Sequence, residues 1–433
     1  MRKKRHLNFS FHQSISRAFG KYSGRLYLLP HPSSIGNALE DYLHALLKAK
    51  ENHQKLTVLT MNKFLRKTNL MLFDPAYLQF TDSIVRPAIG SRQQRFLSTI
   101  FSIYFLLLRL LTMLTYKLFK VKVRDSYFHP SLGQELIWIP SGVETFAWEH
   151  VVKREWANML ENSGIHLRLP ENLEIEQRQL LRQLGIGDQD WFVCVHVREG
   201  GYSGDWNNVR NSNISDYLLA INAITARGGW VVRLGDSSMT KLPILDRVID
   251  LVDHPLKSAL LDAYLVANCS YFIGTMSGMY EYSHLFSKPS LLTNSFSYLA
   301  ALPMKPSDIV IFKHVYSVTK KKFLTIQEWL IGCKQIDEKT WTSSDWIYHD
   351  NSSEEILTAV TELLNGEKNS GIIEQQLDFK KLHLESMRWI STHFRFINND
   401  PLDSINTREQ YRFFTQYLSW KGNVGADFLR KYW

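Results

Sequence analysis

The sequence is poor in cysteine and has no long apolar run near its start. Its three cysteines, at positions 194, 269 and 333, are far apart in the chain. This spacing excludes a disulfide framework and a Cys-x-x-Cys metal pair, and it favours a reducing compartment. The basic start MRKKRHLNFSFHQ is not followed by an apolar segment, so we expect no secretory signal.

Acidic residues are missing from two stretches of the chain. No Asp or Glu precedes Glu40, and none lies between Asp82 and Asp125, although both stretches contain many Lys and Arg residues and the net charge is +9. Residues 1–24 form a basic N-terminal segment. Basic clusters of this kind are suited to anionic lipid or to nucleic acid.

The second of these stretches contains the apolar segment 96–119. Its charge-free run from Phe96 to Leu108 is shorter than the roughly 20 residues that a bilayer span requires. Arg95 and Arg109 fall on one narrow polar stripe, so we expect an amphipathic helix on an anionic membrane surface. The alternative is a buried helix whose arginines reach outward to solvent. We expect no nucleic-acid partner, because the basic residues do not alternate with an aromatic stacking platform.

Strand-like and helix-like segments alternate along the chain from residue 25. RLYLLP, PSSIGNALEDYLHALLKAK and KLTVLTM are typical of a βαβ unit. The alternation restarts at Trp191 and continues through SLLTN as β-α-β-β-α-β-α-β. The pattern predicts an α/β protein with two facing Rossmann-like domains that contain parallel sheets, at 25–185 and 186–340, followed by a helical C-terminal extension at 341–433.

Polar residues follow WFVCVHVR, the first predicted strand of the second domain. His196 and Arg198 share one face of this strand and lie at its exit, where Gly200 and Gly201 permit a ligand to approach the backbone closely. Ligands of open parallel sheets bind beyond the carboxyl ends of the strands. A fixed guanidinium beside a Gly-rich turn is suited to a diphosphate. The alternatives are a structural role for His196 and a surface salt bridge for Arg198.

A second polar group follows the predicted strand in GGWVVRLGD. Arg233, Gly235 and Asp236 lie at its end, on the same predicted edge of the sheet. Asp236 is suited to accept hydrogen bonds from ribose hydroxyls, and it is equally suited to cap the next turn.

Two further strand ends complete this predicted edge. Gly274, Thr275, Ser277 and Gly278 occur where a strand leads into a helix, an arrangement that offers N–H groups and hydroxyls to a phosphate. Asn294 ends the last strand, in SLLTN. The chain has no Gly-Lys-Ser/Thr loop and no Gly-x-Gly-x-x-Gly motif after a strand, which argues against a Walker-type nucleotidase and an NAD enzyme.

Four of these segments together resemble a known family. HVREGGY, VRNSNISDYLLAINAITARGGWVVRLGDSSM, YFIGTMSGM and SLLTN are similar to the core of a family of bacterial glycosyltransferases that are associated with surface-polysaccharide loci. The His-x-Arg strand is more distantly similar to the first motif of fucosyltransferases that use GDP-fucose. The resemblance extends from about Trp191 to Asn294. Near the N-terminus, IGNALED is similar to a family loop that commonly has His where this chain has Asn37.

The resemblance implies a GT-B-like fold and a hexosyl- or deoxyhexosyltransferase. The sugar would pass from a nucleotide-diphosphate donor to a lipid-linked or cell-surface glycan, in polysaccharide or lipopolysaccharide biosynthesis. Arg198 would pair with the donor diphosphate, and Arg210 in the VRNSNI block would be a second cation for it. Further donor contacts fall on the strand ends, at Gly200, Gly201, Arg233, Gly235, Asp236, Gly274, Thr275, Ser277, Gly278 and Asn294.

A carboxylate at this predicted edge could act as the general base that accepts the proton of the acceptor hydroxyl. Glu199, Asp205 and Glu281 are available. We assign Glu199 as the base, beside Arg198 and His196 as the other catalytic residues, with a solvated loop acid as the alternative for Glu199.

The segment Asp188-Gln-Asp190 matches the Asp-x-Asp pattern of metal-dependent glycosyltransferases, but it precedes a strand. We therefore expect a turn there, no metal, and no cofactor besides the nucleotide-sugar donor, with a GDP-sugar favoured. The expected location is cytoplasmic, peripherally on the inner face of the cell membrane. The alternatives are another GT-B transferase, such as a heptosyl- or Kdo-transferase, and a non-catalytic scaffold of a glycan-assembly complex.

Overall fold

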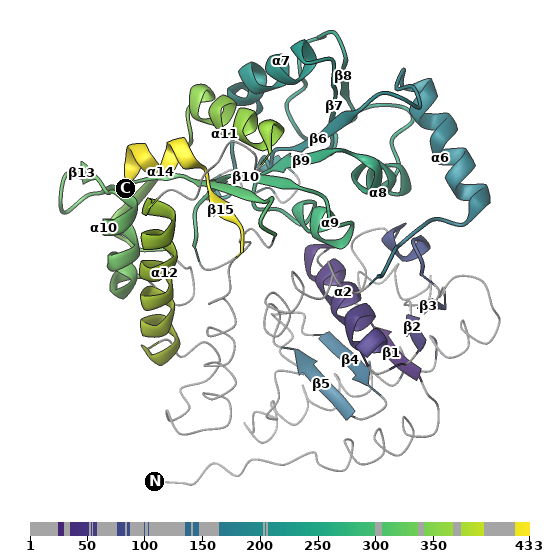
Figure 1. Ribbon diagram of the computed structural model, residues 1–433, viewed down its shortest axis with the longest axis horizontal. Coiled ribbons are helices and arrows are strands. Elements are labelled where there is room, and N and C mark those ends of the chain that lie inside the picture. The colour runs from purple at the N-terminus through teal and green to yellow at the C-terminus, as the bar shows by residue number, and fades with distance from the viewer. Residues whose placement is uncertain are drawn as a thin grey trace. The chain divides into compact units, whose positions relative to one another are not determined.

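The chain folds into two compact units, Met1–Glu174 and Ile175–Trp433, in the computed structural model (Figure 1). The described residues of the larger part are 164–298 without 202–203 and 205–206, and 305–336, 342–366, 374–393 and 421–433. Shorter segments are described nearer the N-terminus, at 25–29, 35–51, 53, 55–58, 76–82, 85–86, 99, 103, 135–139 and 142–146. The basic segment 1–24 and nearly all of 96–119 lie outside the described residues. Within the described part of the chain, no helix is both long and apolar enough to cross a membrane.

The first unit contains a mixed sheet in the order β3-β2-β1-β4-β5. β1 (Arg25–Leu29), α2 (Ile35–Glu51) and β2 (Lys55–Val58) form the predicted parallel βαβ unit, and β2 also pairs in parallel with β3 (Val85–Arg86). IGNALED therefore lies in the first turns of α2 rather than in a loop. The sequence between β2 and β3 also contains the short 3-10 helix η2 (Ala76–Gln79).

The prediction of an entirely parallel sheet is wrong for the other half of the first unit. β4 (Glu135–Ile139) runs antiparallel to β1, and β5 (Gly142–Phe146) runs antiparallel to β4, with Ile139 opposite Gly142. Only two residues separate β4 from β5, and such a short connection forms a hairpin, since a parallel pair needs a crossover of a dozen residues or more.

The second unit is built on a sheet in which all seven described strands are parallel. The strand order is β15-β11-β10-β9-β6-β7-β8. In this order β7 and β8 lie on one side of β6, and the other four strands lie on its other side, as in a Rossmann-like fold. The bounds are β6 (Phe192–His196), β7 (Trp230–Arg233), β8 (Val248–Asp250), β9 (Tyr271–Gly274), β10 (Ser290–Ser295), β11 (Ile309–Phe312) and β15 (Asn423–Val424).

Helices cover both faces of this sheet. α7 (Leu218–Ala226) and α11 (Ser353–Asn365) contact each other on one face, and α8 (Ala259–Asn268) and α9 (Tyr280–Leu285) contact each other on the opposite face (Figure 1). All five residues of β6 are buried, as expected for a central strand of a doubly covered sheet. The predicted element order from Trp191 to Asn294 is confirmed. The helix α6 (Glu171–Gln183) precedes this stretch, and the 3-10 helix η5 (Ile214–Tyr217) directly precedes α7.

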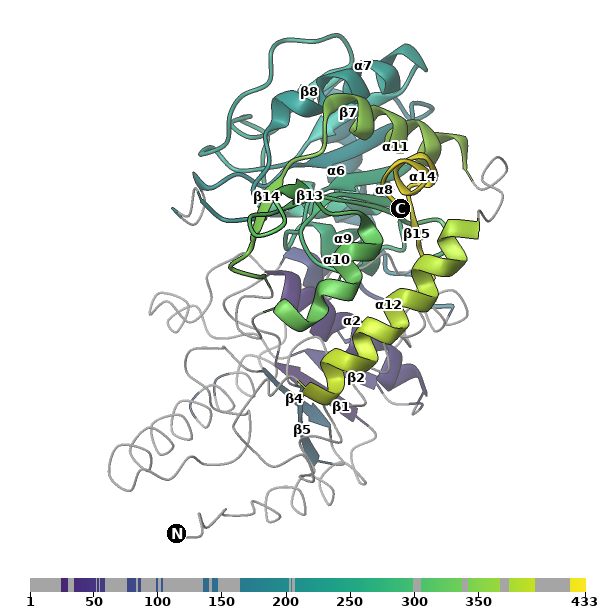
Figure 2. The same ribbon diagram turned by 90° about the vertical axis from the view of Figure 1, so that its left-hand side faces the viewer.

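The predicted C-terminal extension, 341–433, is an integral part of the second unit. α11 lies on the sheet, and β15 is its seventh strand, although β15 is 110 residues beyond β11 in the sequence. β14 (Trp346–His349) belongs to a small antiparallel sheet with β12 (His314–Ser317) and β13 (Lys322–Phe323). α12 (Glu374–His393) packs beside α10 (Ile326–Ile331) (Figure 2), and the chain ends with α14 (Ala426–Tyr432); η6 (Gly332–Gln335) follows α10.

Candidate functional site

The candidate site lies at the carboxyl ends of β6 and β9. These strands are neighbours in the sheet, yet the chain leaves β6 toward β7 and leaves β9 toward β10, on opposite sides. Such a change of direction is the topological switch point of a doubly wound sheet, and ligands of such sheets bind in the crevice outside the strand ends at this point. His196 is the last residue of β6, and Gly274 is the last residue of β9. The predicted first and third groups of site residues therefore meet at this edge.

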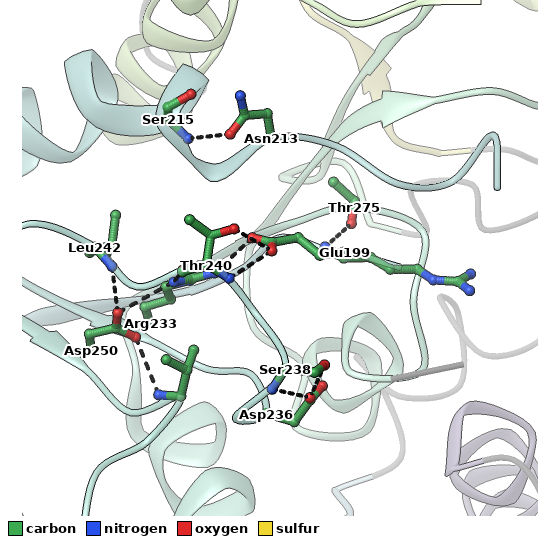
Figure 3. Close-up of polar contacts among 12 residues, drawn as sticks. Glu199, Asn213, Ser215, Arg233, Asp236, Ser238, Thr240, Leu242, Asp250 and Thr275 are labelled. Atoms are coloured by element: carbon green, nitrogen blue, oxygen red, sulfur yellow. Dashed lines mark hydrogen bonds and ion pairs between the residues drawn. The ribbon is translucent and has the colours of Figure 1, made fainter. Parts of the chain in front are cut away.

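Three hydrogen bonds join the loop after β6 to the loop after β9. The backbone N–H of Thr275 donates to the carbonyl of His196 at 3.2 Å. The backbone N–H of Arg198 donates to Thr275 Oγ1 at 2.9 Å (Figure 3). His196 Nδ1 and Ser277 Oγ are 3.1 Å apart, within hydrogen-bond distance. An added Cβ on Gly274 would lie only 3.0 Å from the His196 carbonyl, so this close approach requires glycine.

The imidazole of His196 is neutral at physiological pH. Its side chain is buried, and this burial, reinforced by the positive charges of Arg233 and Lys257, lowers the pKa of His196 to about 4. A neutral ring can hold the Ser277 hydroxyl in place without adding charge to the crevice. His196 therefore acts here as a hydrogen-bonding partner.

Two buried histidines make the stability of the protein depend on pH. Burial lowers the pKa of His383 on α12 to about 4, as it does for His196. In the unfolded chain both rings bind a proton near pH 6.5, so between about pH 6.5 and 4 the unfolded state holds more protons. The contribution of each histidine to the free energy of unfolding is thus complete above about pH 6.5 and is lost as the pH falls toward 4.

The substitution His383→Gln is expected to flatten this pH dependence. Glutamine does not titrate, yet it can still donate to the Tyr298 carbonyl that lies 2.9 Å from His383 Nε2. Between about pH 4.5 and 6, the slope of the unfolding free energy should decrease by about 1 kcal/mol per pH unit relative to the parent protein. Urea denaturation at a series of pH values measures this difference. Equal slopes in the two proteins would contradict a neutral buried His383.

Arg198 and Arg210 lie on adjoining segments at the edge of the crevice. Both residues are half-buried. The Arg198 carbonyl accepts a hydrogen bond from the N–H of Ser212 at 2.9 Å, which brings the VRNSNI block against the loop after β6. Arg210 Nε donates to Asn208 Oδ1 at 3.2 Å. The structure thus places the two predicted diphosphate-binding arginines near one strand exit.

Lysine 313 anchors the same block from the other side and was not predicted as a site residue. Lys313 directly follows β11, and its buried Nζ donates to the carbonyl of Asn211 at 2.8 Å and pairs with Asp350. The segment 207–213 is therefore held both at the exit of β6 and at the exit of β11. The signal available in the sequence was a lysine immediately after the apolar strand IVIF.

The structure does not support Glu199 as the general base. Its carboxylate is almost completely buried. Oε1 lies 3.0 Å from Arg233 Nη2, and Oε2 accepts hydrogen bonds from the N–H and the hydroxyl of Thr240 at 2.8 and 2.9 Å (Figure 3). Both oxygens are occupied by internal donors, so neither faces an acceptor sugar. Of the other two carboxylates, Glu281 is bound to His284 Nδ1 at 2.7 Å, and Asp205 lies outside the described residues.

Arg233 and Thr275 also have partners that differ from the predicted ones. Arg233 has no exposed surface, so its guanidinium is a structural element behind the crevice rather than a donor contact. Thr275 is fully buried as well, and both its N–H and its hydroxyl are used to join the two loops. Of the predicted phosphate cradle, Ser277 and Gly278 remain partly exposed.

The loop after β7 contacts the Gly-rich turn after β6. Asp236 Oδ1 accepts hydrogen bonds from the backbone N–H of Ser238, at 2.9 Å, and from its hydroxyl (Figure 3), which is the turn-capping role. A Cβ on Gly201 would lie 2.3 Å from Ser238 Oγ, and a Cβ on Gly235 would lie 2.4 Å from Met239 Sδ. Gly200 is buried. Gly201 therefore lets the two loops approach each other closely, whereas Gly235 leaves room for Met239 within the loop after β7.

Asn294 is part of a buried network rather than of the crevice surface. It adopts a left-handed backbone (φ 52°) and is 1% exposed. Its N–H donates to Asn351 Oδ1 at 2.8 Å, and Asn294 Oδ1 in turn accepts from the N–H of Asn351 at 2.6 Å. Asn294 Nδ2 donates to the Tyr217 hydroxyl at 3.3 Å. The predicted donor contact at Asn294 is therefore wrong, because the amide joins β10 to the segment before α11.

The segment Asp188-Gln-Asp190 forms a turn. Asp188 pairs with Arg182 at 2.5 Å, and Asp190 Oδ2 accepts from the N–H of Gly187 at 2.8 Å. Among the residues that the structure describes, no three His, Cys, Asp or Glu side chains are grouped so that they could hold a metal ion.

Comparison with known proteins gives only distant similarities. No protein family and no curated protein sequence matches this chain. A glycosyl transferase family 9 protein from Veillonella parvula is 13% identical, with 79% of this chain and 97% of that chain covered and a TM-score of 0.40. For the ADP-heptose lipopolysaccharide heptosyltransferase II of E. coli the values are 11% identity, 66% and 89% coverage, and a TM-score of 0.35. Similarity at this level transfers neither substrate nor mechanism.

Proposed function

We propose that the protein is a glycosyltransferase that moves a sugar from a nucleotide-diphosphate donor to a lipid-linked or cell-surface glycan. One observation carries the proposal: at the crevice between β6 and β9, three hydrogen bonds hold the Arg198 loop against the Ser277 loop. A Rossmann-like sheet with a cation and a hydroxyl at this crevice is suited to a nucleoside diphosphate. The similarity of the HVREGGY and GTMSG segments to bacterial glycosyltransferases supports the same substrate class.

The chemistry assigned to this site is stabilisation of a leaving diphosphate. As the bond between the sugar and the diphosphate breaks, negative charge grows on the phosphate oxygens, and fixed cations lower the energy of that state. Arg198 is the first such cation and Arg210 the second. Ser277, held by the neutral His196, is placed to donate a hydrogen bond to the same oxygens. We do not assign the activation of the acceptor hydroxyl to Glu199, because both of its carboxylate oxygens are occupied.

Trials of donors with the purified full-length chain test the proposal. GDP-, UDP- and ADP-sugars are offered with a bacterial glycolipid extract, and CMP-sugars serve as the control because they leave as a monophosphate. We expect turnover with one diphosphate donor, and GDP-sugars are tried first. We also expect turnover to persist in EDTA, since the arginines supply the positive charge. A chain that neither binds nor consumes any of these donors would overturn the proposal.

The lipid-linked acceptor rests on the basic segment 1–24 and on the apolar, basic segment 96–119. Both are suited to an anionic membrane surface. Sedimentation with vesicles that contain anionic lipid, compared with neutral vesicles, tests this part of the proposal. Equal recovery in the two pellets would contradict it.

A further inference from the structure

A completely buried arginine joins the exits of three adjacent strands beside the crevice. Arg233 ends β7, and its Nη2 contacts Glu199, which follows β6. Nη1 lies 3.3 Å from Oδ2 of Asp250, the last residue of β8, and also donates to the carbonyl of Thr240 (Figure 3). We name these four residues the Arg233 cluster. One guanidinium therefore fixes the distances between β6, β7 and β8 at their carboxyl ends.

The two carboxylates of the Arg233 cluster also hold backbone groups. Glu199 accepts from the N–H and the hydroxyl of Thr240. Asp250 Oδ2 accepts from the N–H of Leu242 at 2.8 Å, and Asp250 Oδ1 accepts from the N–H of Val252 at 3.2 Å. The loops after β7 and β8 are thus tied to the same charged group as the loop after β6.

This cluster reaches Arg198 through a single peptide bond. The backbone of Arg198 is fixed by Thr275 at its N–H and by Ser212 at its carbonyl. The next side chain, Glu199, is fixed by Arg233. Three contacts therefore hold two consecutive residues, and they fix the position of the Arg198 Cα. The position of this atom determines the volume that the guanidinium can reach.

Stability alone is a poor explanation for the charges of the Arg233 cluster. A buried ion pair must be desolvated, and apolar replacements of similar volume are often as stable. Here one guanidinium faces two carboxylates, and its Nε–H finds no acceptor among the described residues. What the charges supply is direction, because a planar guanidinium binds carboxylates only in its own plane.

We propose that the Arg233 cluster is a positioning device that holds Arg198 at the donor diphosphate; Glu199, Arg233 and Asp250 are its positioning residues. This inference rests on the proposed function and adds to it. It also gives Glu199 a role that its burial allows.

The substitution Glu199→Gln tests the inference. Glutamine has the same size, but it has no charge to pair with the guanidinium, and its single acceptor oxygen can serve Arg233 or Thr240 but not both. We expect the KM for the donor to rise and its kcat/KM to fall by about 10- to 100-fold, since a misplacement of about 1 Å can reduce the rate by this order, while the KM for the acceptor is unchanged. Thr240→Val is the milder variant, because it removes only the hydroxyl that donates to Glu199. It should also raise the donor KM, but by less.

Asp308→Asn is the matched control. Asp308 is a fully buried carboxylate of the same sheet, at its amino edge, where it accepts from the N–H groups of Ser290 and Lys305 at 3.0 and 2.9 Å. We expect this variant to lower the melting temperature and to leave the donor KM unchanged.

The outcomes distinguish a failure of the positioning role from a failure of the proposed function. A donor KM that rises in Glu199→Gln and Thr240→Val but not in Asp308→Asn supports the positioning role. A donor KM at the parent value in a folded Glu199→Gln or Thr240→Val variant overturns it, even if the melting temperature falls. If the parent protein itself binds and turns over no nucleotide sugar, the proposed function fails first.

Discussion

Replacement of Arg198 by alanine should reduce donor turnover by about 10²- to 10³-fold, the usual loss when one preorganised donor to a developing oxyanion is removed. The reason lies in the position of this residue. It follows β6 at the candidate site, its backbone N–H is bound to Thr275, and the residue is half-buried, so the point from which its side chain starts is fixed. Removal of the side chain leaves the hydrogen bonds of the backbone intact, and the fold should persist.

Steady-state kinetics with the donor identified in the trials above measure this effect. Arg227→Ala is the control, because Arg227 lies at the end of α7, is exposed, and donates to Asn365 Oδ1 at 3.2 Å away from the crevice. Both variants should have the melting temperature of the parent within a few degrees. Turnover unaltered in Arg198→Ala would remove Arg198 from the donor site. Equal losses in the two variants would point to a general effect of lost positive charge.

The core of the second unit could be predicted from the sequence because its signals are local. The strands from β6 to β10 are short apolar runs. A polar turn and a helix follow β6, β8 and β9, and a polar loop leads from β7 to β8, so the element order follows from periodicity. Parallel pairing then follows from the helical crossovers. The positions of His196, Arg198 and Ser277 at one edge follow from the rule that parallel strands end on the same side.

Elements whose partners are distant in the sequence could not be predicted. β15 has two residues, Asn423–Val424, and no periodicity distinguishes them from a loop. They form a strand because β11 offers an unpaired edge, to which Asn423 and Val424 are matched in register. For the same reason the region after residue 340 was interpreted as a helical extension. Its helices were visible in the sequence, whereas its attachment to the sheet was not.

The errors at the candidate site have one physical origin. Glu199 was predicted as the general base, and Arg233 and Asn294 as donor contacts, because polar residues at strand ends commonly bind ligands or act in catalysis. The sequence does not show which of them find internal partners, and burial decides between the two roles. Lys313 and Asn351 were missed for the complementary reason. They lie on elements outside the recognised segments, and folding alone brings them to Asn211 and Asn294.

Deletion of residues 421–433 should unfold the second unit or leave it marginally stable. This segment supplies β15 and α14, and it buries Val424, Phe428 and Leu429. Each such side chain contributes about 1.5–3 kcal/mol, so the loss of all three removes roughly 5–9 kcal/mol, comparable with the net stability of a typical domain. The deletion also removes the N–H of Ala426, which donates to the Glu362 carboxylate at 2.8 Å. It exposes the edge of β11 as well.

The substitutions Leu429→Ala and Arg430→Ala separate the effect of buried apolar packing from the effect of surface charge. Leu429 is fully buried, so Leu429→Ala should lower the free energy of unfolding by about 2–5 kcal/mol. Arg430 is its exposed neighbour and pairs with Asp427 at the surface, so Arg430→Ala should change the same free energy by about 0.5 kcal/mol or less. Urea denaturation followed by circular dichroism measures all three proteins. A deletion variant as stable as the parent would show that β15 and α14 are dispensable, and the sheet would then end at β11. If Leu429→Ala lowers the stability and Arg430→Ala does not, this terminal segment stabilises the seven-stranded sheet through buried apolar contact.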